Sequence, residues 1–234
     1  MGLVKQLLQD PSISKVYATY RTFANAGNLT VLTKEYSDRL VCLQVDVTDE
    51  TQIAEKLKQI HAEVATLHRV IYCVGLLHEG KLQPEKSLRQ IESDHLLRYF
   101  QVNSIGAILF AKHLLPLFSH DDRSIFASIS AKIGSIGDNY LGGWYGYRAS
   151  KAALNMFMRT TAIEYKRKSP HTIVVTLHPG TTDTHLSQPF QKNVPPSQLF
   201  SVERTVNQLS AVMNNLTVAD SGEFFSWDGS RLPW

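Results

Sequence analysis

Strand-like and helix-like segments alternate along nearly the whole chain, and this alternation limits the possible folds more than any other feature. Runs rich in β-branched and aromatic residues predict strands at 14–20, 39–47, 69–75, 123–131, 172–180 and 222–229. Helical spacing of apolar residues predicts helices at about 53–67, 86–118 (with a break near Ser93-Asp94), 145–168 and 199–214. Such alternation requires βαβ crossovers and therefore a parallel sheet. We expect one doubly wound, Rossmann-like α/β domain spanning residues 1–234.

Two local features refine this expectation. Thr48 is the expected N-cap of the helix that follows the second strand, because acidic residues stand directly after it. The run 69–75 is apolar enough for a strand that is buried on both faces. In open parallel sheets ligands bind beyond the carboxyl ends of the strands, so functional residues are expected just after each strand.

Composition excludes several classes of protein. The net charge is only +3 and no basic cluster stands out, which argues against a nucleic-acid partner. No apolar run reaches the roughly 20 residues of a membrane helix, and the N-terminus lacks signal-peptide features. Two cysteines cannot build a disulfide framework, so a cytoplasmic location is expected. The nine histidines show no metal-ligand spacing, and no metal site is expected.

Tyr147 and Lys151 stand four residues apart near a predicted helix start, so they share one helix face. An ammonium near a phenol stabilises phenolate and lowers its pKa toward a value useful in acid–base catalysis. On these two residues alone, a core tyrosine and a solvated lysine would be the simpler interpretation.

Five motifs in order change that interpretation. They are DVTD (46–49), CVG (73–75), VNSIG (102–106), YRASK (147–151) and PGTTDT (179–184). With them the chain resembles the short-chain dehydrogenase/reductase family over nearly its whole length. GSIGDNYLGGWYGYRASKAALN is similar to the branch of C-factor and sniffer-type carbonyl reductases. The resemblance implies hydride transfer between a nicotinamide cofactor and a carbonyl or alcohol substrate.

The resemblance also implies roles for individual residues. Tyr147 would be the general acid or base, Lys151 would lower its pKa and bind the nicotinamide ribose, and Asn103 would hold a proton-relay water. Cofactor contacts are implied for Asp46 and Val47 at the adenine, for Gly75, and for Pro179, Gly180, Thr182 and Thr184 at the nicotinamide. Asn103 could also be a helix-kink residue and Thr184 a helix N-cap.

Arg21 indicates the cofactor type. It ends the segment ATYR, where family members that prefer NAD carry an acidic residue for the ribose hydroxyl. A guanidinium instead makes forked bonds to phosphate oxygens. The expected cofactor is therefore NADP(H) rather than NAD(H), the alternative being an ordinary surface arginine.

The substrate-orienting serine departs from the family pattern. Counting back from Gly134, its place is held by Ala131, while Ser130 lies one residue earlier and Ser135 one residue after the glycine. Ser130 is assigned the role, which requires the strand end to twist or bulge because neighbouring strand residues face opposite ways. Ser128 is expected to pack within the sheet.

The start of the chain is the larger departure. Family members open with a strand and a Gly-rich turn that binds the cofactor pyrophosphate, and this sequence begins inside what resembles the first helix. We interpret Met1 as an internal methionine of a longer coding sequence. The first central strand would then be missing between the strands at 14–20 and 69–75. Those strands would pair directly, another segment or chain would fill the gap, or the chain would fold poorly, and NADPH binding is expected to be weak or absent.

The leading function is thus an NADP(H)-dependent carbonyl reductase or alcohol dehydrogenase acting on a small molecule. The alternative is a non-catalytic signalling or scaffold member of the same fold, similar to C-factor. A homodimer or homotetramer is implied through the helices near 95–118 and 145–168. Substrate specificity would come from residues 76–86 and from the segment after Thr184, and the sequence does not identify the substrate.

Overall fold

Parallel strands and helices alternate along the chain as predicted. The computed structural model describes the backbone of residues 1–234 and every side chain except those of Asn25 and Asn28. The main strands are β1 (Val16–Tyr20), β2 (Leu40–Gln44), β3 (Arg69–Tyr72), β4 (Ser124–Ile129), β5 (Thr172–His178) and β8 (Phe224–Ser226). The helices are α1 (Gly2–Gln9), α2 (Phe23–Glu35), α3 (Glu50–Val64), α4 (Ser93–Phe100), α5 (Gly106–Leu114), α6 (Tyr145–Lys168) and α7 (Val202–Asn215). A short parallel pair, β6 (Thr181–Thr182) and β7 (Leu199–Phe200), was not predicted.

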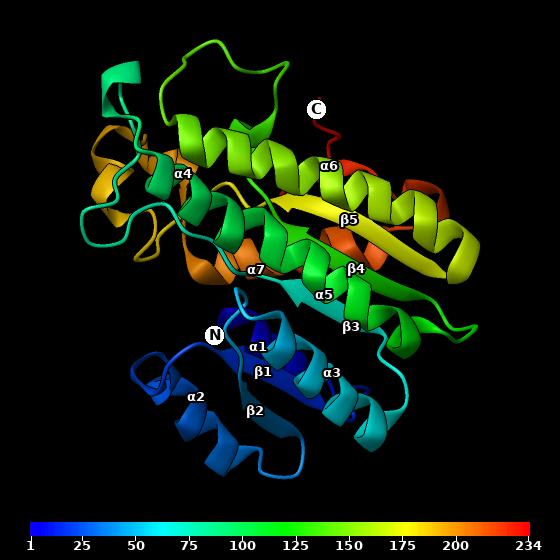
Figure 1. Ribbon diagram of the computed structural model, residues 1–234. Coiled ribbons are helices and arrows are strands. Elements are labelled where there is room, and N and C mark those ends of the chain that lie inside the picture. Colours follow the sequence, from blue (N-terminus) through cyan, green and yellow to red (C-terminus); the bar gives the residue numbers. More distant parts are fainter.

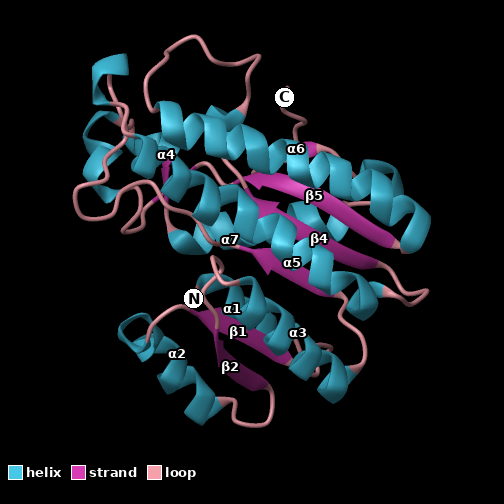
Figure 2. Ribbon diagram, viewed as in Figure 1, coloured by secondary structure: helices cyan, strands magenta, loops and turns pink.

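The six main strands form two separate parallel sheets (Figures 1 and 2). β3, β4, β5 and β8 form a four-stranded sheet in that order, and β1 pairs only with β2. Among the residues that the structure describes, β1 and β3 share no ladder, so direct pairing of these two strands, one of the three outcomes considered, is wrong. The sheet is therefore divided between β1 and β3.

Helices cover both faces of the four-stranded sheet, which makes it doubly wound. In β4, Phe126 packs on one face with α5 and α6, whereas Ile125 and Ala127 pack on the other with α7. This alternation follows from the two-residue period of a strand. A third apolar cluster, which includes Leu8, Leu32 and Leu40, packs around β1 and β2.

Several local predictions need correction. Asp49, not Thr48, caps α3, because its carboxylate accepts a hydrogen bond from the backbone nitrogen of Gln52. The long helix predicted from residue 86 begins only at Ser93, after a single turn at residues 88–90. β3 is mostly half-buried rather than buried on both faces, since only Tyr72 is fully covered. The helix α2 was not predicted.

The length of α6 raises the question of a membrane span. Its outer surface carries many charged side chains, including Lys166, Arg167 and Lys168 in the last turn. In the part of the chain that the structure describes, no helix combines the length and the apolar character needed to cross a bilayer.

Candidate functional site

The first turns of α6 bring Tyr147 and Lys151 together as their spacing predicted. The Lys151 Nζ lies 5.9 Å from the centroid of the Tyr147 ring. Both residues are buried, with 7% of Tyr147 and 2% of Lys151 exposed. Gly134 allows this packing, because a Cβ there would lie only 2.8 Å from the Lys151 Cβ. The prediction of a solvated Lys151 is therefore excluded.

Lys151 is a buried cation at the carboxyl end of β4. Its Nζ donates a hydrogen bond of 2.9 Å to the backbone oxygen of Ile129. Burial lowers the pKa of Lys151 to about 8, because the charged ammonium is poorly solvated there. Gly75, which follows β3, leaves room beside it: a Cβ on Gly75 would be 3.6 Å from the Nζ and 3.9 Å from the Asn103 Oδ1.

Asn103 connects the loop after β3 to α6. It lies in a π-helical turn (Gln101–Ile105) between α4 and α5, a kind of irregularity that is frequent at functional sites. Its Oδ1 accepts from the Leu76 nitrogen at 2.6 Å, and its Nδ2 donates to the Leu76 oxygen and to the Ser150 Oγ, each at 2.9 Å. Ser150 in turn donates to the Tyr147 backbone oxygen. The amide thereby holds α6 at a set distance from Gly75.

The surroundings of Tyr147 are mainly aromatic. Its ring lies edge-on to Tyr99 and Trp144, and Trp144 contacts Phe190 with a centroid distance of 4.9 Å. Burial raises the pKa of Tyr147 above its ordinary value, since phenolate would be poorly solvated. The sequence predicted the opposite shift. Here the Lys151 ammonium is bonded to Ile129, and the loss of solvation outweighs its attraction for phenolate.

The Ser130 hydroxyl bonds Asn155 of α6 rather than Tyr147. Ser130 lies just after β4, 2% exposed, and its Oγ donates to the Asn155 Oδ1 at 2.6 Å. Ser128 donates to the Met158 sulfur inside the core, as expected for a residue that packs within the sheet. The substrate-orienting role of Ser130 stays a prediction.

A second group of predicted residues lies at the ends of β1 and β2. A cavity of about 80 Å³ is lined by Thr19, Tyr20, Arg21, Val45, Asp46, Val47, Val74, Arg98 and Val102. Thr48 donates to the Asp46 carboxylate from both its nitrogen and its hydroxyl. Burial opposes ionisation of Asp46, but these hydrogen bonds and the nearby Arg21 and Arg98 lower its pKa overall.

Arg21 is held by a carboxylate that the sequence did not point to. Both terminal nitrogens of Arg21 contact the Glu79 Oε1, at 3.1 and 3.2 Å, and the Arg98 Nε contacts the Glu79 Oε2 at 3.1 Å. Two guanidinium groups thus face one cavity edge. Arg98 and Glu79 were missed because they come from α4 and from the loop after β3, which no spacing rule links to Arg21.

The predicted loop 179–184 follows β5 and approaches the same site. Gly180 has a φ of 71°, and the Phe200 ring occupies the place where its Cβ would be, so only glycine fits there. The Thr182 hydroxyl bonds the Thr205 hydroxyl at 2.8 Å, while Thr184 is exposed. Leu186, just beyond, lies 3.8 Å from the place of a Gly75 Cβ. The segment that directly follows this loop therefore lies beside Gly75.

A buried carboxylate that sequence reasoning missed supports the start of α6. Trp144 precedes α6 in the left-handed region, with a φ of 53°. The Glu85 Oε2 accepts a hydrogen bond from the Gly146 nitrogen at 3.1 Å, where the helix dipole favours negative charge. Glu85 is 2% exposed, and its Oε1 has no hydrogen-bond partner among the described residues.

We expect Glu85→Ala to lower the free energy of unfolding by about 1–2 kcal/mol, the usual effect of losing a helix cap. Glu85→Gln should retain most of the stability, because its amide oxygen can accept from Gly146. Urea unfolding measures both, with the exposed Glu92→Ala as the control expected to change little. Equal stability of Glu85→Ala and the wild type would contradict this role.

A larger surface hollow, about 340 Å³, lies elsewhere. It is lined by α7 and the region of β8, including Gln208, Val212, Phe225 and Trp227. None of the predicted site residues lines it. The candidate site is therefore the region between Arg21 and Lys151 at the carboxyl ends of the strands.

Known proteins with a similar sequence include C-signal and several dehydrogenases and reductases. C-signal of Myxococcus xanthus is 28% identical over 148 residues, covering 63% of this chain and 84% of that protein. Benzil reductase ((S)-benzoin forming) of Saccharomyces cerevisiae is 28% identical over 204 residues, covering 84% of this chain and 72% of that protein.

Solved structures with the same fold include two carbonyl reductases at 25% identity. The carbonyl reductase Sniffer of D. melanogaster aligns with a TM-score of 0.86, covering all of this chain and 94% of its own. The NADPH-bound carbonyl reductase from chicken fatty liver aligns with a TM-score of 0.88, covering all of this chain and 93% of its own. The family model described as short chain dehydrogenase matches residues 3–195. Because this match spans well over half of the sequence, the chain belongs to the short chain dehydrogenase family.

Proposed function

We propose that this chain transfers a hydride between NADP(H) and a carbonyl or alcohol substrate, with Tyr147 as the general acid or base. Membership of the family supports the oxidoreductase class. The main support for the role of Tyr147 is the position of the Lys151 Nζ. This atom is buried, lies 5.9 Å from the Tyr147 ring, and is next to Gly75 and Asn103. These four residues come from three separate parts of the chain and meet at the carboxyl ends of the strands, where parallel sheets bind ligands.

The residues present fit a nicotinamide dinucleotide. Arg21, Asp46 and Val47 line one cavity and would hold the adenosine part. Gly75, Lys151 and the segment Pro179–Thr184 would hold the nicotinamide ribose and carboxamide. Gly75 supports this assignment, because any larger residue would fill the space beside the Lys151 Nζ. When bound, the cofactor supplies or accepts the hydride.

Tyr147 handles the proton in this proposal. Its burial keeps the phenol protonated at neutral pH, which is the form that a general acid needs for carbonyl reduction. Lys151 is charged below about pH 8 and would stabilise the phenolate left after proton transfer. Asn103 positions α6 through Leu76 and Ser150 and would hold the relay water that returns the proton.

The walls of the site favour an apolar, aromatic substrate. Trp144 and Phe190 stand in contact beside Tyr147, and Leu186 lies near Gly75. Aromatic surfaces bind flat apolar groups well. The similarity to a benzil reductase supports the choice of an aryl ketone as the first test substrate.

An assay of NADPH oxidation with benzil and other aryl ketones tests the proposed function. NADPH is used at millimolar concentration, because weak cofactor binding stays our prediction. Turnover that requires both ketone and NADPH supports the proposal. Absence of turnover across aliphatic and aryl carbonyls, with binding of NADPH confirmed by calorimetry, would refute it.

Arg21 gives a separate prediction about the cofactor. Its guanidinium can bond a 2′-phosphate, so Arg21→Ala should weaken NADPH binding about tenfold or more and leave NADH binding nearly unchanged. Arg98→Ala serves as the comparison, because it removes the second guanidinium group that lines the same cavity. Calorimetric titration of each variant with both cofactors measures the effect. Equal loss for NADPH and NADH would show that Arg21 has no role in phosphate selection.

A non-catalytic role is the second candidate. The similarity to C-signal and the alanine at position 131 favour a signalling or scaffold member of the fold. Lack of turnover by a chain that is folded and binds NADPH would favour this candidate.

Assembly and location stay proposals. We retain a homodimer or homotetramer, supported by Met156 and Ile163, which are 65% and 57% exposed on the outer surface of α6. Ala107 and Ala111 of α5 do not contribute to such an interface, because they are buried within the chain. The free cysteines Cys42 and Cys73 fit a cytoplasmic location.

A further inference from the structure

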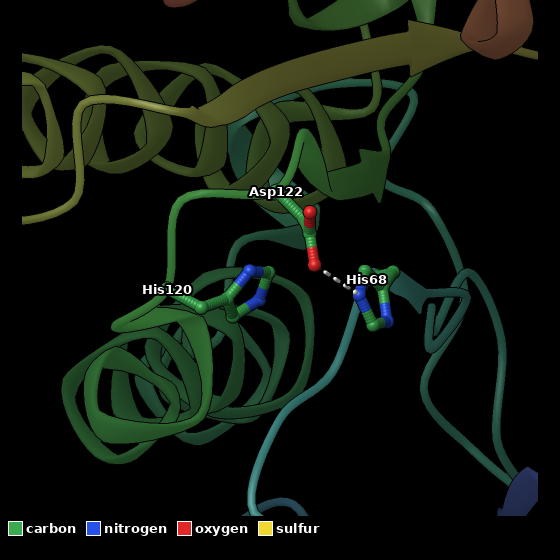
Figure 3. Close-up of side chains that lie close together, drawn as sticks. All are labelled: His68, His120 and Asp122. Carbon is green, nitrogen blue, oxygen red and sulfur yellow. Dashed lines mark hydrogen bonds and ion pairs between the residues drawn. The ribbon is translucent and has the colours of Figure 1, made fainter.

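Two histidines and an aspartate meet at the end of the sheet opposite the candidate site. His68 directly precedes β3, and His120 and Asp122 lie in the loop that leads into β4. Figure 3 shows the Asp122 carboxylate between the two imidazole rings. Tyr147 and Lys151 lie instead at the carboxyl ends of the strands, so this cluster takes no part in the proposed reaction.

We propose that His68, His120 and Asp122 form a binding site for a transition-metal dication such as Zn²⁺. One ligand atom from each residue lies within 4.8 Å of the others. The sequence predicted no metal site, because His68 stands 52 residues before His120 and no local spacing links them. The fold brings them together by pairing β3 with β4.

The hydrogen bonds of His120 leave one ring nitrogen free for a metal. Its Nε2 lies 2.9 Å from the Leu67 backbone oxygen, and a carbonyl can only accept, so Nε2 carries the hydrogen. In the neutral ring Nδ1 then holds a lone pair. This Nδ1 is buried and has no hydrogen-bond partner among the described residues. Metal-bound histidines usually donate their other ring nitrogen to a carbonyl or carboxylate in the same way.

The other two ligands are spaced as a tetrahedral ion requires. The His68 Nε2 and the Asp122 Oδ2 are 3.4 Å apart. Two ligands bound at 2.0–2.1 Å to a tetrahedral zinc ion are about 3.3 Å apart. The His68 and His120 ring centroids are 4.9 Å apart, so the second imidazole lies beside this pair.

Backbone hydrogen bonds hold the two ligand-bearing segments in place. The Leu67 nitrogen donates to the Leu117 oxygen, and the Ile125 nitrogen donates to the His68 oxygen, both at 2.9 Å. A third bond joins the His120 nitrogen to the Phe118 oxygen. The site is therefore largely formed without an ion, which lowers the entropy cost of binding.

The ligand set selects the type of metal. Two imidazoles and one carboxylate suit zinc and its neighbours, whereas Mg²⁺ and Ca²⁺ prefer oxygen ligands only. The His68 and Asp122 side chains are 58% and 78% exposed, so an ion can enter from solution and water can complete its coordination. A bound ion would join the segments that lead into β3 and β4.

Calorimetric titration with Zn²⁺ alone, and separately with Mg²⁺, tests the proposal. The wild type should bind one Zn²⁺ per chain with micromolar or tighter affinity and should bind Mg²⁺ far more weakly. His68→Ala, His120→Ala and Asp122→Asn should each weaken Zn²⁺ binding at least tenfold. His61→Ala, which removes an exposed histidine of α3, should bind as the wild type does.

Thermal unfolding gives a second readout that does not depend on any enzyme activity. Zn²⁺ should raise the Tm of the wild type and of His61→Ala, and should leave the Tm of the His68→Ala/His120→Ala double variant unchanged. Without metal, His120→Ala should be slightly less stable than the wild type, because it loses the hydrogen bond from Nε2 to the Leu67 oxygen. Zn²⁺ binding that survives in the double variant, or no binding to the wild type at millimolar Zn²⁺, would overturn the proposal. Failure here leaves the proposed oxidoreductase function untouched.

Discussion

Replacing Tyr147 by Phe should lower kcat/KM for ketone reduction by about 10²–10⁴-fold, the range that a general acid contributes. The change removes only the phenol oxygen and keeps the ring in contact with Tyr99 and Trp144. No hydrogen bond of the Tyr147 hydroxyl occurs among the described residues, so stability should change little. NADPH affinity should also be nearly unchanged, because the loss affects the transition state rather than binding.

Tyr145→Phe is the matched control for this variant. Tyr145 is the first residue of α6, two positions before Tyr147, and it is 36% exposed. It should retain wild-type kcat/KM and Tm. If Tyr147→Phe also kept its activity, Tyr147 would not be the proton donor. If Tyr147→Phe lost turnover but retained a biological output, the non-catalytic signalling function would be favoured.

Lys151→Met should have the second-largest effect on activity. It should lower kcat/KM but raise the stability of the fold. Met keeps the length and apolar contacts of the side chain but removes the ammonium that would stabilise phenolate. We expect kcat/KM to fall by about 10²-fold or more. The variant should nevertheless be more stable than the wild type at neutral pH, because burial of the ammonium is unfavourable.

The pH dependence of the free energy of unfolding follows from the pKa of Lys151. Burial lowers it from 10.5 to about 8, so between these values the unfolded chain binds more protons than the folded one. Wild-type stability should therefore rise with pH across that window, by about 3 kcal/mol in total for this 2% exposed side chain. In Lys151→Met, the loss of the hydrogen bond to Ile129 reduces the gain in stability at neutral pH by about 1 kcal/mol.

Urea unfolding of both proteins between pH 7 and 11 measures this difference. The stability advantage of Lys151→Met should be largest below about pH 8 and should disappear above about pH 10.5. Lys166→Met, at an exposed position of the same helix, should show neither the stability gain nor the loss of activity. A constant difference at all pH values would show that the Lys151 ammonium is not destabilised by burial.

Local spacing was enough to predict the elements that carry the site. The helix predicted at 145–168 is α6 to the residue, and the strands at 123–131 and 172–180 contain β4 and β5. Tyr147 and Lys151 share a face because they are four residues apart on a helix. The separation of β1 and β2 from the four-stranded sheet was not predicted, because direct pairing of β1 with β3 was one of the outcomes that the sequence left open.

Other parts of the site could not be predicted because they depend on residues that are far apart. Glu85 reaches the start of α6 from the loop before α4, and Glu79 joins Arg21 to Arg98. No pattern in the neighbouring sequence identifies either carboxylate as part of the site. The unpredicted α2 shows a further limit, because its residues lack a clear apolar periodicity, and packing against β1 and β2 stabilises it as a helix.

The amino-acid sequence alone determined the parallel α/β architecture, the family and the pairing of Tyr147 with Lys151. Each of these depends on periodicity or motifs within a few residues, and helices and strands have set repeats. Only the tertiary structure decided that the Tyr147 pKa rises, that Lys151 bonds Ile129, and that His68 meets His120 and Asp122. The solvation and the contacts of a side chain depend on which distant segments surround it. The local sequence does not specify those segments.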